Sequence, residues 1–481
     1  MISESMLKDL CKFPSLVQHR EPRLRFGSDN PSHFDTHPLN GLLRYGPYSI
    51  GKVFGLTNPI RIGGIAPKGS LGSVKRIVNE LRAPASPRER QKYLVNWPGF
   101  SRIFGLDVDT AREENWIELP FGLSLDDCDP EIVRSEIIDA FSRAIRRLSS
   151  RLEQFDVIYI FIPDSWSVVS YSGPDDDFDL HDFIKALAAS LGVTTQIIND
   201  GRSGALSYRC RCSVMWRLGI ASYTKAGGVP WILADLEEGT AFIALDYAIR
   251  KAGPAEARFA ICCSQVFDSE GAGLEFVAYE ERDAMFSGKN PFLSKSQMLK
   301  VMASSLSIFQ KRNGGVLPKR VIVFKNSEWK DEEIDGCFEA LGAVGKIDLI
   351  QINVSPGWEG VWFDEKKSAS NFPCARGTSI QIGPFEQLLW TDGNAPRIVG
   401  GTNYYKSGKG IPRPIMLTRF AGDGAMDEIA DYVLALTKMD WNNDGPYDHL
   451  PVVLSYAGRL ARVVKRMPML ESRPYPFRQF M

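Results

Sequence analysis

The sequence predicts an α/β protein whose first half contains a parallel sheet. An amphipathic stretch at 129–155 leads into the continuous apolar run DVIYIFIP (156–163), which is typical of a strand buried on both faces. A second helical pattern starts at residue 177 and is followed by VTTQII (193–198). Because strands and helices alternate in this way, we expect a Rossmann-like layer in this half of the chain.

Helical spacing and end signals define the elements of this first half. NPIRIGGIAP (58–67) is expected to form a strand that runs into a loop. Asp129 suits the cap of the long helix and Pro130 its first position. The expected buried stripe of this helix consists of Val133, Ile137, Phe141, Ile145, Leu148 and Leu152.

The second half of the chain contains a meander of strands followed by strand–helix units. Strands are expected at 239–250 and in ARFAICCSQVF, LEFVAYEE and RVIVFKN, and a basic helix is expected at 450–467. This order fits an RNase H-like sheet, although the periodicity alone also allows other α/β layers. We therefore divide the chain into a polar extension (1–40), a first domain (41–235) and a second domain (236–481).

Composition places the 481-residue chain among soluble globular proteins. It is 44% hydrophobic and 24% charged, and its net charge of -1 gives no global sign of a nucleic-acid or membrane partner. The eight cysteines form no CxxC pair and the five histidines are dispersed, so we expect no structural metal. The start resembles no signal peptide and no apolar run suits a membrane span, so a cytoplasmic location is expected.

Cationic side chains gather in one part of the first domain. Residues 201–230 contain five basic residues and no acid, which indicates a local positive surface. Lys225 ends the helix in this stretch, and His181 and Lys185 lie one turn apart on another helix. Together with Gln196 they come from element ends of one layer, where such folds place ligands, and their chemistry suits a phosphate group. Taken alone, each side chain is better explained as a surface residue paired with a nearby aspartate, and only the four together favour a phosphate site.

These residues carry a resemblance to a known family. The order HDFIK, then Gln196 in GVTTQ, then Lys225 in YTKAGGVPW resembles the guide 5′-phosphate pocket of Argonaute MID domains. In the second half, TAFIALDYA, RGTSIQIGPFEQLLWTDG and LPVVLSYAGRLA are similar to PIWI motifs. The resemblance implies a MID domain followed by a PIWI domain, as in the short prokaryotic Argonautes, with the phosphate held by His181, Lys185, Gln196 and Lys225.

The resemblance also implies that cleavage has been lost. PIWI cleavage is a two-metal phosphodiester hydrolysis that needs about four clustered ligands. Asp246 stands at the first ligand position, whereas Asn326 and Gly458 stand at two others. Glu328 or Asp331 would replace Asn326 only after a register shift. We therefore expect a catalytically inactive PIWI domain with no catalytic residue of its own.

A further set of residues is expected to contact the nucleic-acid backbone or a metal. The tail 451–481 carries six basic residues against one acid, Glu471, and Lys406 and Lys409 are weaker candidates. By analogy with prokaryotic Argonautes, the terminal carboxylate of Met481 would help to hold Mg²⁺ at the guide 5′ end. The expected backbone contacts are Arg209, Arg211, Arg419, Arg459, Arg462 and Lys465.

The function implied by the resemblance is guided recognition. The protein would bind a 5′-phosphorylated guide RNA, pair it with single-stranded target DNA of an invading plasmid or phage, and activate a partner. That partner would be an APAZ-domain protein fused to a TIR or sirtuin-like NAD-degrading domain or to a nuclease, in a heterodimer that can assemble further. Two alternatives remain: a self-sufficient guided endonuclease, and an α/β protein that binds a small phosphorylated metabolite.

Overall fold

The computed structural model describes most of the chain. The described residues are 16–27, 29–50, 56–125, 129–171, 178–252, 257–268, 273–281, 285–287, 290–363, 368–398, 401, 403–405, 410–465 and 475–481.

The first unit has a parallel sheet with helices on both faces. Its strands in spatial order are β5 (Val108–Thr110), β4 (Ile60–Ala66), β7 (Val157–Phe161) and β8 (Thr195–Ile198), and β6 (Trp116–Glu118) also pairs with β4. On one face Ile158 and Ile160 pack against α5 (Pro130–Ser149) and α7 (Leu180–Ser190). On the other, Tyr159 packs with α3 (Leu71–Arg82) and α8 (Arg211–Lys225). The apolar run 156–163 is therefore covered on both sides, and the Rossmann-like prediction is confirmed.

The long helix of this unit is shorter than its periodicity predicted. Asp129 accepts a hydrogen bond from the Glu131 main chain (2.9 Å) and begins α5 as expected. The helix ends at Ser149, and a short 3₁₀ turn (Leu152–Gln154) follows. Leu152 is 41% exposed, so the end of the predicted stripe was wrong. The chain has to leave the helix there in order to enter β7.

The second unit is built on one mixed sheet of ten strands. Three parallel strands form its centre, with antiparallel strands on either side, which is the RNase H-like arrangement that the second half predicted. The order is β1 (Leu16–Gln18), β17 (Thr378–Gln381), β18 (Glu386–Leu389), β19 (Ile415–Ala421), β16 (Lys346–Asn353), β15 (Arg320–Lys325), β10 (Thr240–Ala252), β11 (Ala257–Phe267), β12 (Gly273–Glu281) and β20 (Tyr475–Pro476).

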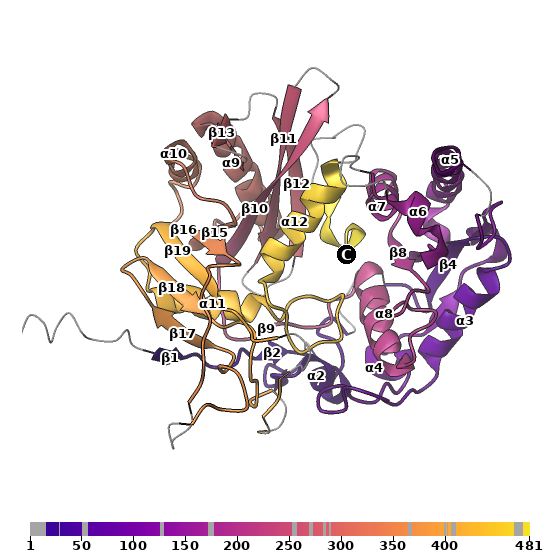
Figure 1. The fold of residues 1–481 in the computed structure, drawn as a ribbon, viewed down its shortest axis with the longest axis horizontal. Coiled ribbons are helices and arrows are strands. Elements are labelled where there is room, and N and C mark those ends of the chain that lie inside the picture. The colour runs from indigo at the N-terminus through magenta and orange to yellow at the C-terminus, as the bar shows by residue number, and fades with distance from the viewer. Residues whose placement is uncertain are drawn as a thin grey trace, which may run out of the picture.

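Helices cover both faces of this sheet. Residues of α9 (Lys295–Arg312) and α10 (Asp331–Ala340) pack on one face, and residues of α11 (Met426–Leu436) and α12 (Val452–Lys465) pack on the other. In Figure 1, α12 lies along the side of the sheet that faces the first unit. It is the basic helix expected at 450–467, and most of its length is buried.

The segment 16–35 joins both units and does not form an irregular extension. β1 is an edge strand of the large sheet, where it pairs with β17. β2 (Leu24–Arg25) then pairs with β3 (Phe34–Asp35) and with β9 (Ile232–Leu233). This segment was predicted to be irregular because its strands have only two or three residues and show no alternation.

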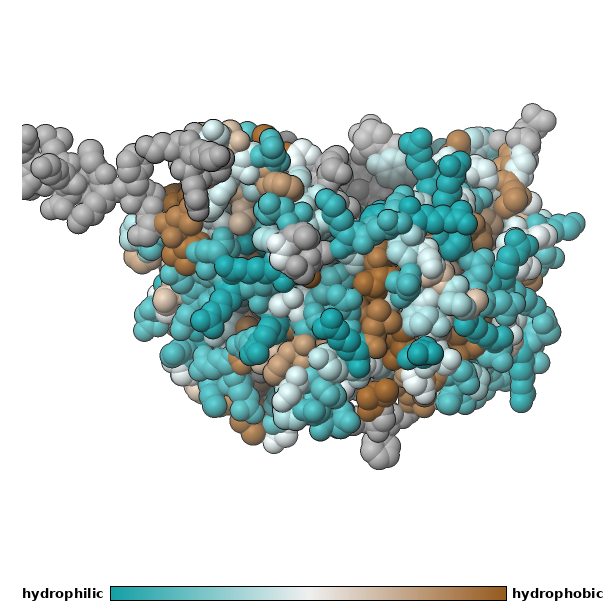
Figure 2. All heavy atoms as spheres, turned by 90° about the horizontal axis from the view of Figure 1, so that it is seen from below, coloured by the Kyte–Doolittle hydropathy of each residue, from teal (hydrophilic) through white to brown (hydrophobic). Residues whose placement is uncertain are grey.

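The surface is mainly polar. Figure 2 shows a face on which hydrophilic residues predominate and hydrophobic residues form small separate patches. Within the part of the chain that the structure describes, no helix combines the length and the apolar character that a bilayer crossing requires.

The end of the chain fills the space between the two units. Tyr475 and Phe480 pack in one small core with Ala186 and Ala189 of α7 and with Leu460 of α12. The chain end in Figure 1 accordingly lies between α12, α7 and α8. This wedge positions the candidate site.

Candidate functional site

Three of the four predicted phosphate ligands meet at the junction of the two units. The Lys185 Nζ donates to the main-chain oxygens of Thr195 and Met481, each at 2.7 Å. The Lys225 Nζ donates to the Gln196 Oε1. The two lysines also interact with each other directly. Cations from α7 and α8, an amide from β8 and the main chain of residue 481 therefore form one cluster.

The cluster lies beside an edge strand of the parallel sheet. β8 is the last strand of its sheet, so one side of its main chain is open. The oxygen of Thr195 accepts from Lys185, and the oxygen of Ile197 accepts from the Gln196 side chain (2.9 Å). Burial of this edge by the C-terminal wedge gives the site its position.

Both lysines are almost completely withdrawn from water. Lys185 is 2% exposed and Lys225 is 1% exposed. Burial lowers the pKa of Lys185 to about 7. The pKa of Lys225 is well below its usual value because of burial and because of the like charge on Lys185. Among the described residues, neither lysine forms an ion pair with a carboxylate side chain. The lowered pKa values mean that the pair carries less than its full positive charge near neutral pH.

His181 does not join the cluster. Its side chain is 54% exposed, and its Nδ1 lies 3.1 Å from the Asp182 Oδ1. Asp179 is close to both groups, but it serves as the cap of α7 and accepts from the Asp182 main chain (3.1 Å). His181 and Lys185 lie one helical turn apart, but Lys185 is buried in the site whereas His181 lies at its exposed edge. Sequence spacing could not predict that difference in burial.

Two of the predicted backbone contacts are used inside the protein. Arg211 donates to Glu80 (2.7 Å) and to the main chain of Ala205. Arg419 is 9% exposed and lies 3.4 Å from Asp348. The Arg419 side chain is therefore buried, whereas that of Arg211 remains 31% exposed beside Glu80, and contact of either with a nucleic-acid backbone stays a prediction.

The other predicted backbone contacts lie at or near the surface. Arg209 and Arg462 are exposed, and Lys465 is half-buried. Arg459 stacks on the Tyr456 ring and lies 3.7 Å from Asp440. Lys406, Lys409 and Glu471 are outside the described residues.

The sequence argument did not place Arg478 at the phosphate cluster. Its Nη1 would be 2.8 Å from a Cβ built on Gly227, two residues after Lys225. Burial lowers the pKa of Arg478. In the sequence, only the glycine pair after α8, Gly227 and Gly228, indicates that another group approaches the main chain closely there.

The three positions that correspond to the PIWI ligands do come together. The Asn326 Nδ2 donates to the Asp246 Oδ1 at 3.2 Å. A Cβ built on Gly458 would lie 2.8 Å from the Asp246 Oδ2. Asp246 ends up between β15 and α12, and burial raises its pKa. These residues line an open groove of about 500 Å³.

This arrangement does not fit a two-metal centre. Asn326 turns a donor toward the carboxylate, and Gly458 has no side chain in the space that Asp246 fills. Among the described residues, the trio of His, Cys or acid side chains that could share an ion is Asp179, His181 and Asp182, far along the chain from Asp246. Two divalent ions need several carboxylate or imidazole ligands in fixed positions.

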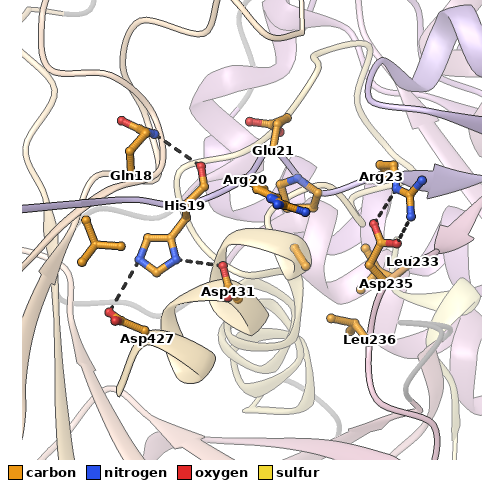
Figure 3. A pocket seen from close by; sticks show the side chains of 13 residues that line it. Gln18, His19, Arg20, Glu21, Arg23, Leu233, Asp235, Leu236, Asp427 and Asp431 are labelled. Carbon is orange, nitrogen blue, oxygen red and sulfur yellow. Dashed lines mark hydrogen bonds and ion pairs between the residues drawn. The ribbon is translucent and has the colours of Figure 1, made fainter. Parts of the chain in front are cut away.

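A larger cavity lies elsewhere and has different chemistry. About 760 Å³ is enclosed by residues 17–23, by Leu233–Leu236 and by α11. Figure 3 shows His19 between Asp427 and Asp431, and Arg23 paired with Asp235. Because its charged groups are largely paired with each other, this cavity is a weaker phosphate site than the lysine cluster.

A glycine substitution tests the close approach of α12 to Asp246. Gly458→Ala should lower the free energy of unfolding by about 1–3 kcal/mol, because the added methyl group meets the carboxylate. The loss should be much smaller in an Asp246→Ala background. Urea denaturation of the four proteins measures it, with Gly72→Ala, which meets no atom, as the control. Equal losses in both backgrounds would rule out this contact.

Comparison with known proteins supports the fold. No family model matches the chain, and no curated protein matches it. It is similar to Clostridium butyricum Argonaute bound to a guide DNA and a 19-mer target DNA (15% identity, TM-score 0.65), over 97% of this chain and 55% of that one. It is also similar to Aquifex aeolicus Argonaute with externally bound siRNA (13% identity, TM-score 0.62), over 98% and 56%. The chain thus spans just over half the length of these structures, and its fold is that of an Argonaute MID unit followed by a PIWI unit.

Proposed function

We propose that the chain is the guide-binding subunit of a prokaryotic Argonaute defence system in the cytoplasm. It binds a 5′-phosphorylated guide RNA and presents it to complementary single-stranded DNA of an invading plasmid or phage. Base pairing then carries the specificity, while the protein holds the backbone. The subunit itself does not cut.

The observation that carries this proposal is the pair of buried lysines. Lys185 and Lys225 sit together away from water, and burial and mutual repulsion lower the pKa values of both. A terminal phosphate carries up to two negative charges. Beside the two lysines it would offset both the cost of burying their charges and the repulsion between them. Burial of two amines without a carboxylate side chain beside them lowers the stability of the fold. Binding of an anionic ligand would explain why the protein contains such a cluster.

Each group has a distinct role toward the phosphate. The two lysines supply charge, and Gln196 supplies a directional amide. The rim position of His181 suits contact with the first nucleotide, either by stacking on the base or by donating to the phosphate. Arg459, Arg462 and Lys465 on α12, with Arg209, would follow the guide and target backbones.

A nucleic acid suits this site better than a small metabolite. The lysine cluster lies where the MID and PIWI units meet, under the segment that ends at Met481, and residues of α12 line the Asp246 groove nearby. The C. butyricum structure contains a guide and a target DNA, and the A. aeolicus structure contains an siRNA. We infer that a strand bound to this chain would run between its two units.

The main-chain oxygen of Met481 is the candidate ligand for Mg²⁺ at the guide 5′ end. It is buried and lies 2.7 Å from Lys185. One protein oxygen beside an amine is a weak site alone, and Mg²⁺ typically combines few protein ligands with phosphate oxygens. The ion would therefore enter with the guide and neutralise part of its charge.

The effector activity would reside in a partner. We infer a heterodimer with an APAZ-domain protein that carries a TIR, sirtuin-like or nuclease domain, which assembles further when target pairing activates it. The misfit of the Asp246 groove to two metal ions supports a division of labour of this kind over a self-sufficient endonuclease.

Removal of the lysines should abolish recognition of the 5′-phosphate. Each charge-assisted hydrogen bond contributes about 1.5–3 kcal/mol, so Lys185→Ala with Lys225→Ala should weaken binding of a phosphorylated guide by several kcal/mol. Binding of a 5′-hydroxyl guide should change little. Fluorescence anisotropy with both guides measures the difference, and Lys300→Ala, an exposed lysine on α9, is the control. An unchanged preference for phosphate would remove the site assignment.

The preference for phosphate should depend on pH. In the free protein the pKa of Lys185 is about 7, and a bound phosphate raises it, so binding above pH 7 requires proton uptake. Affinity for the phosphorylated guide should therefore fall between pH 7 and 9, by up to about tenfold per pH unit for one proton. The 5′-hydroxyl guide should show no such fall. A flat profile for the phosphorylated guide would contradict the buried, titrating pair.

The nucleic acid that co-purifies with the chain separates the proposal from its alternatives. Sequencing should find short 5′-phosphorylated RNAs in the wild-type protein and few in the double lysine variant. Protein free of nucleic acid that instead binds a small phosphorylated compound would support the metabolite alternative. Target cleavage with Mn²⁺ that disappears in Asp246→Ala would support the endonuclease alternative.

A further inference from the structure

We propose that the groove around Asp246 is a metal-independent clamp for the phosphates of the target strand, in which arginines of α12 replace the divalent ions. The inference rests on the proposed function, because it assumes a guide-bound target. It assigns a role in target binding to the groove that contains the PIWI ligand positions. The positive charge for this role comes from the arginines of the protein itself.

The groove brings the altered ligand positions and two arginines together. Asp246, Asn326 and Gly458 line it, and so do Arg459 and Arg462. Asp246 lies in β10 directly after the residues that pair with β15, Asn326 directly follows the end of β15, and the other three come from one side of α12. A volume of about 500 Å³ that is open to solvent can admit a strand backbone.

Arg462 is placed where a cation is needed. It follows Gly458 by four residues, so the two positions lie on the same side of the helix. Its charge acts directly on Asp246 and partly offsets the effect of burial on that carboxyl group. The metal ions of a cleaving PIWI centre would supply positive charge at this carboxylate, and here an arginine side chain supplies it.

Arg459 extends the positive charge along the groove. Its guanidinium stacks on the Tyr456 ring and lies 3.7 Å from Asp440, which restricts its orientation. Guanidinium groups bind phosphate through two parallel hydrogen bonds, and they do so without a metal. The pair suits successive phosphates of one strand.

Asp246 is the one acid among the described residues that line the groove, and in such a clamp it should weaken phosphate binding. Asp246 helps to orient its surroundings, but its negative charge opposes an approaching phosphate. At a metal centre the same carboxylate would favour binding, because it would hold the ion. A phosphate clamp and a metal centre therefore predict opposite changes in target affinity when the charge of Asp246 is removed.

The test measures target binding by protein that already holds a labelled 5′-phosphorylated guide. The guide is loaded with Mg²⁺, and the complex is then transferred into EDTA, with retention of the label confirming that the guide stays bound. Affinity for a complementary DNA is measured in EDTA, Mg²⁺ and Mn²⁺. The variants are Arg462→Gln and Asp246→Asn, and Arg147→Gln, an exposed arginine of α5, is the control.

We expect Arg462→Gln to weaken target binding about tenfold or more, since a charge-assisted contact is lost. Asp246→Asn should strengthen it about threefold, because one repulsive charge is removed. The wild-type affinity should be the same in EDTA as in Mg²⁺ or Mn²⁺. Arg147→Gln should behave as the wild type does.

Two results would overturn the clamp. One is a target affinity that rises with the divalent ion and loses that rise in Asp246→Asn, as a metal centre requires. The other is an Arg462→Gln protein that binds target as tightly as the Arg147→Gln control. Failure of guide loading is a different outcome, because it would reject the proposed function before the clamp is tested.

Discussion

The structure depends on the burial of two like charges at the contact between its units. Lys185 and Lys225 are anchored by oxygens and an amide, yet no side chain nearby cancels their charge. These hydrogen bonds recover part of the desolvation cost of an ammonium group but do not offset mutual repulsion, and the pKa values of both lysines are lowered accordingly. Under the proposed function, an anion bound here would restore both charges and would stabilise the segment that covers the site.

The altered PIWI centre shows the reverse arrangement. There a carboxylate is buried beside an amide donor and a glycine: the Asn326 side chain and the Tyr247 main chain both donate to Oδ1, and Oδ2 faces Gly458. The absence of a side chain at residue 458 lets α12 approach β10 closely. A substitution that only restored an acid at Gly458 would meet Asp246 before it met a metal. Chemistry and packing thus changed together at this position.

Strand ends were the most predictable part of the chain. The sequence identified β10 and β15 as strands, and their parallel pairing brings Asp246 next to Asn326. It also identified the lysines by their order and by the lack of acids around Lys225. What it could not show is which cations find partners through tertiary contact. Arg211 and Arg419 look the same as Arg462 in sequence, but they meet Glu80 and Asp348, which are distant in the chain.

One helix sets the geometry of both sites, which constrains how either can change. Gly458 lets one side of α12 rest on Asp246, while Leu460 packs with α7 and with the segment that ends at Met481. Close-packed interiors do not absorb a shift locally, so a displacement of α12 must reach both contacts. A position of α12 that made room for metal ligands at residue 458 would also move the wedge that covers Lys185. The lack of room for a side chain beside Asp246 and the covered lysine pair are therefore two consequences of a single helix position.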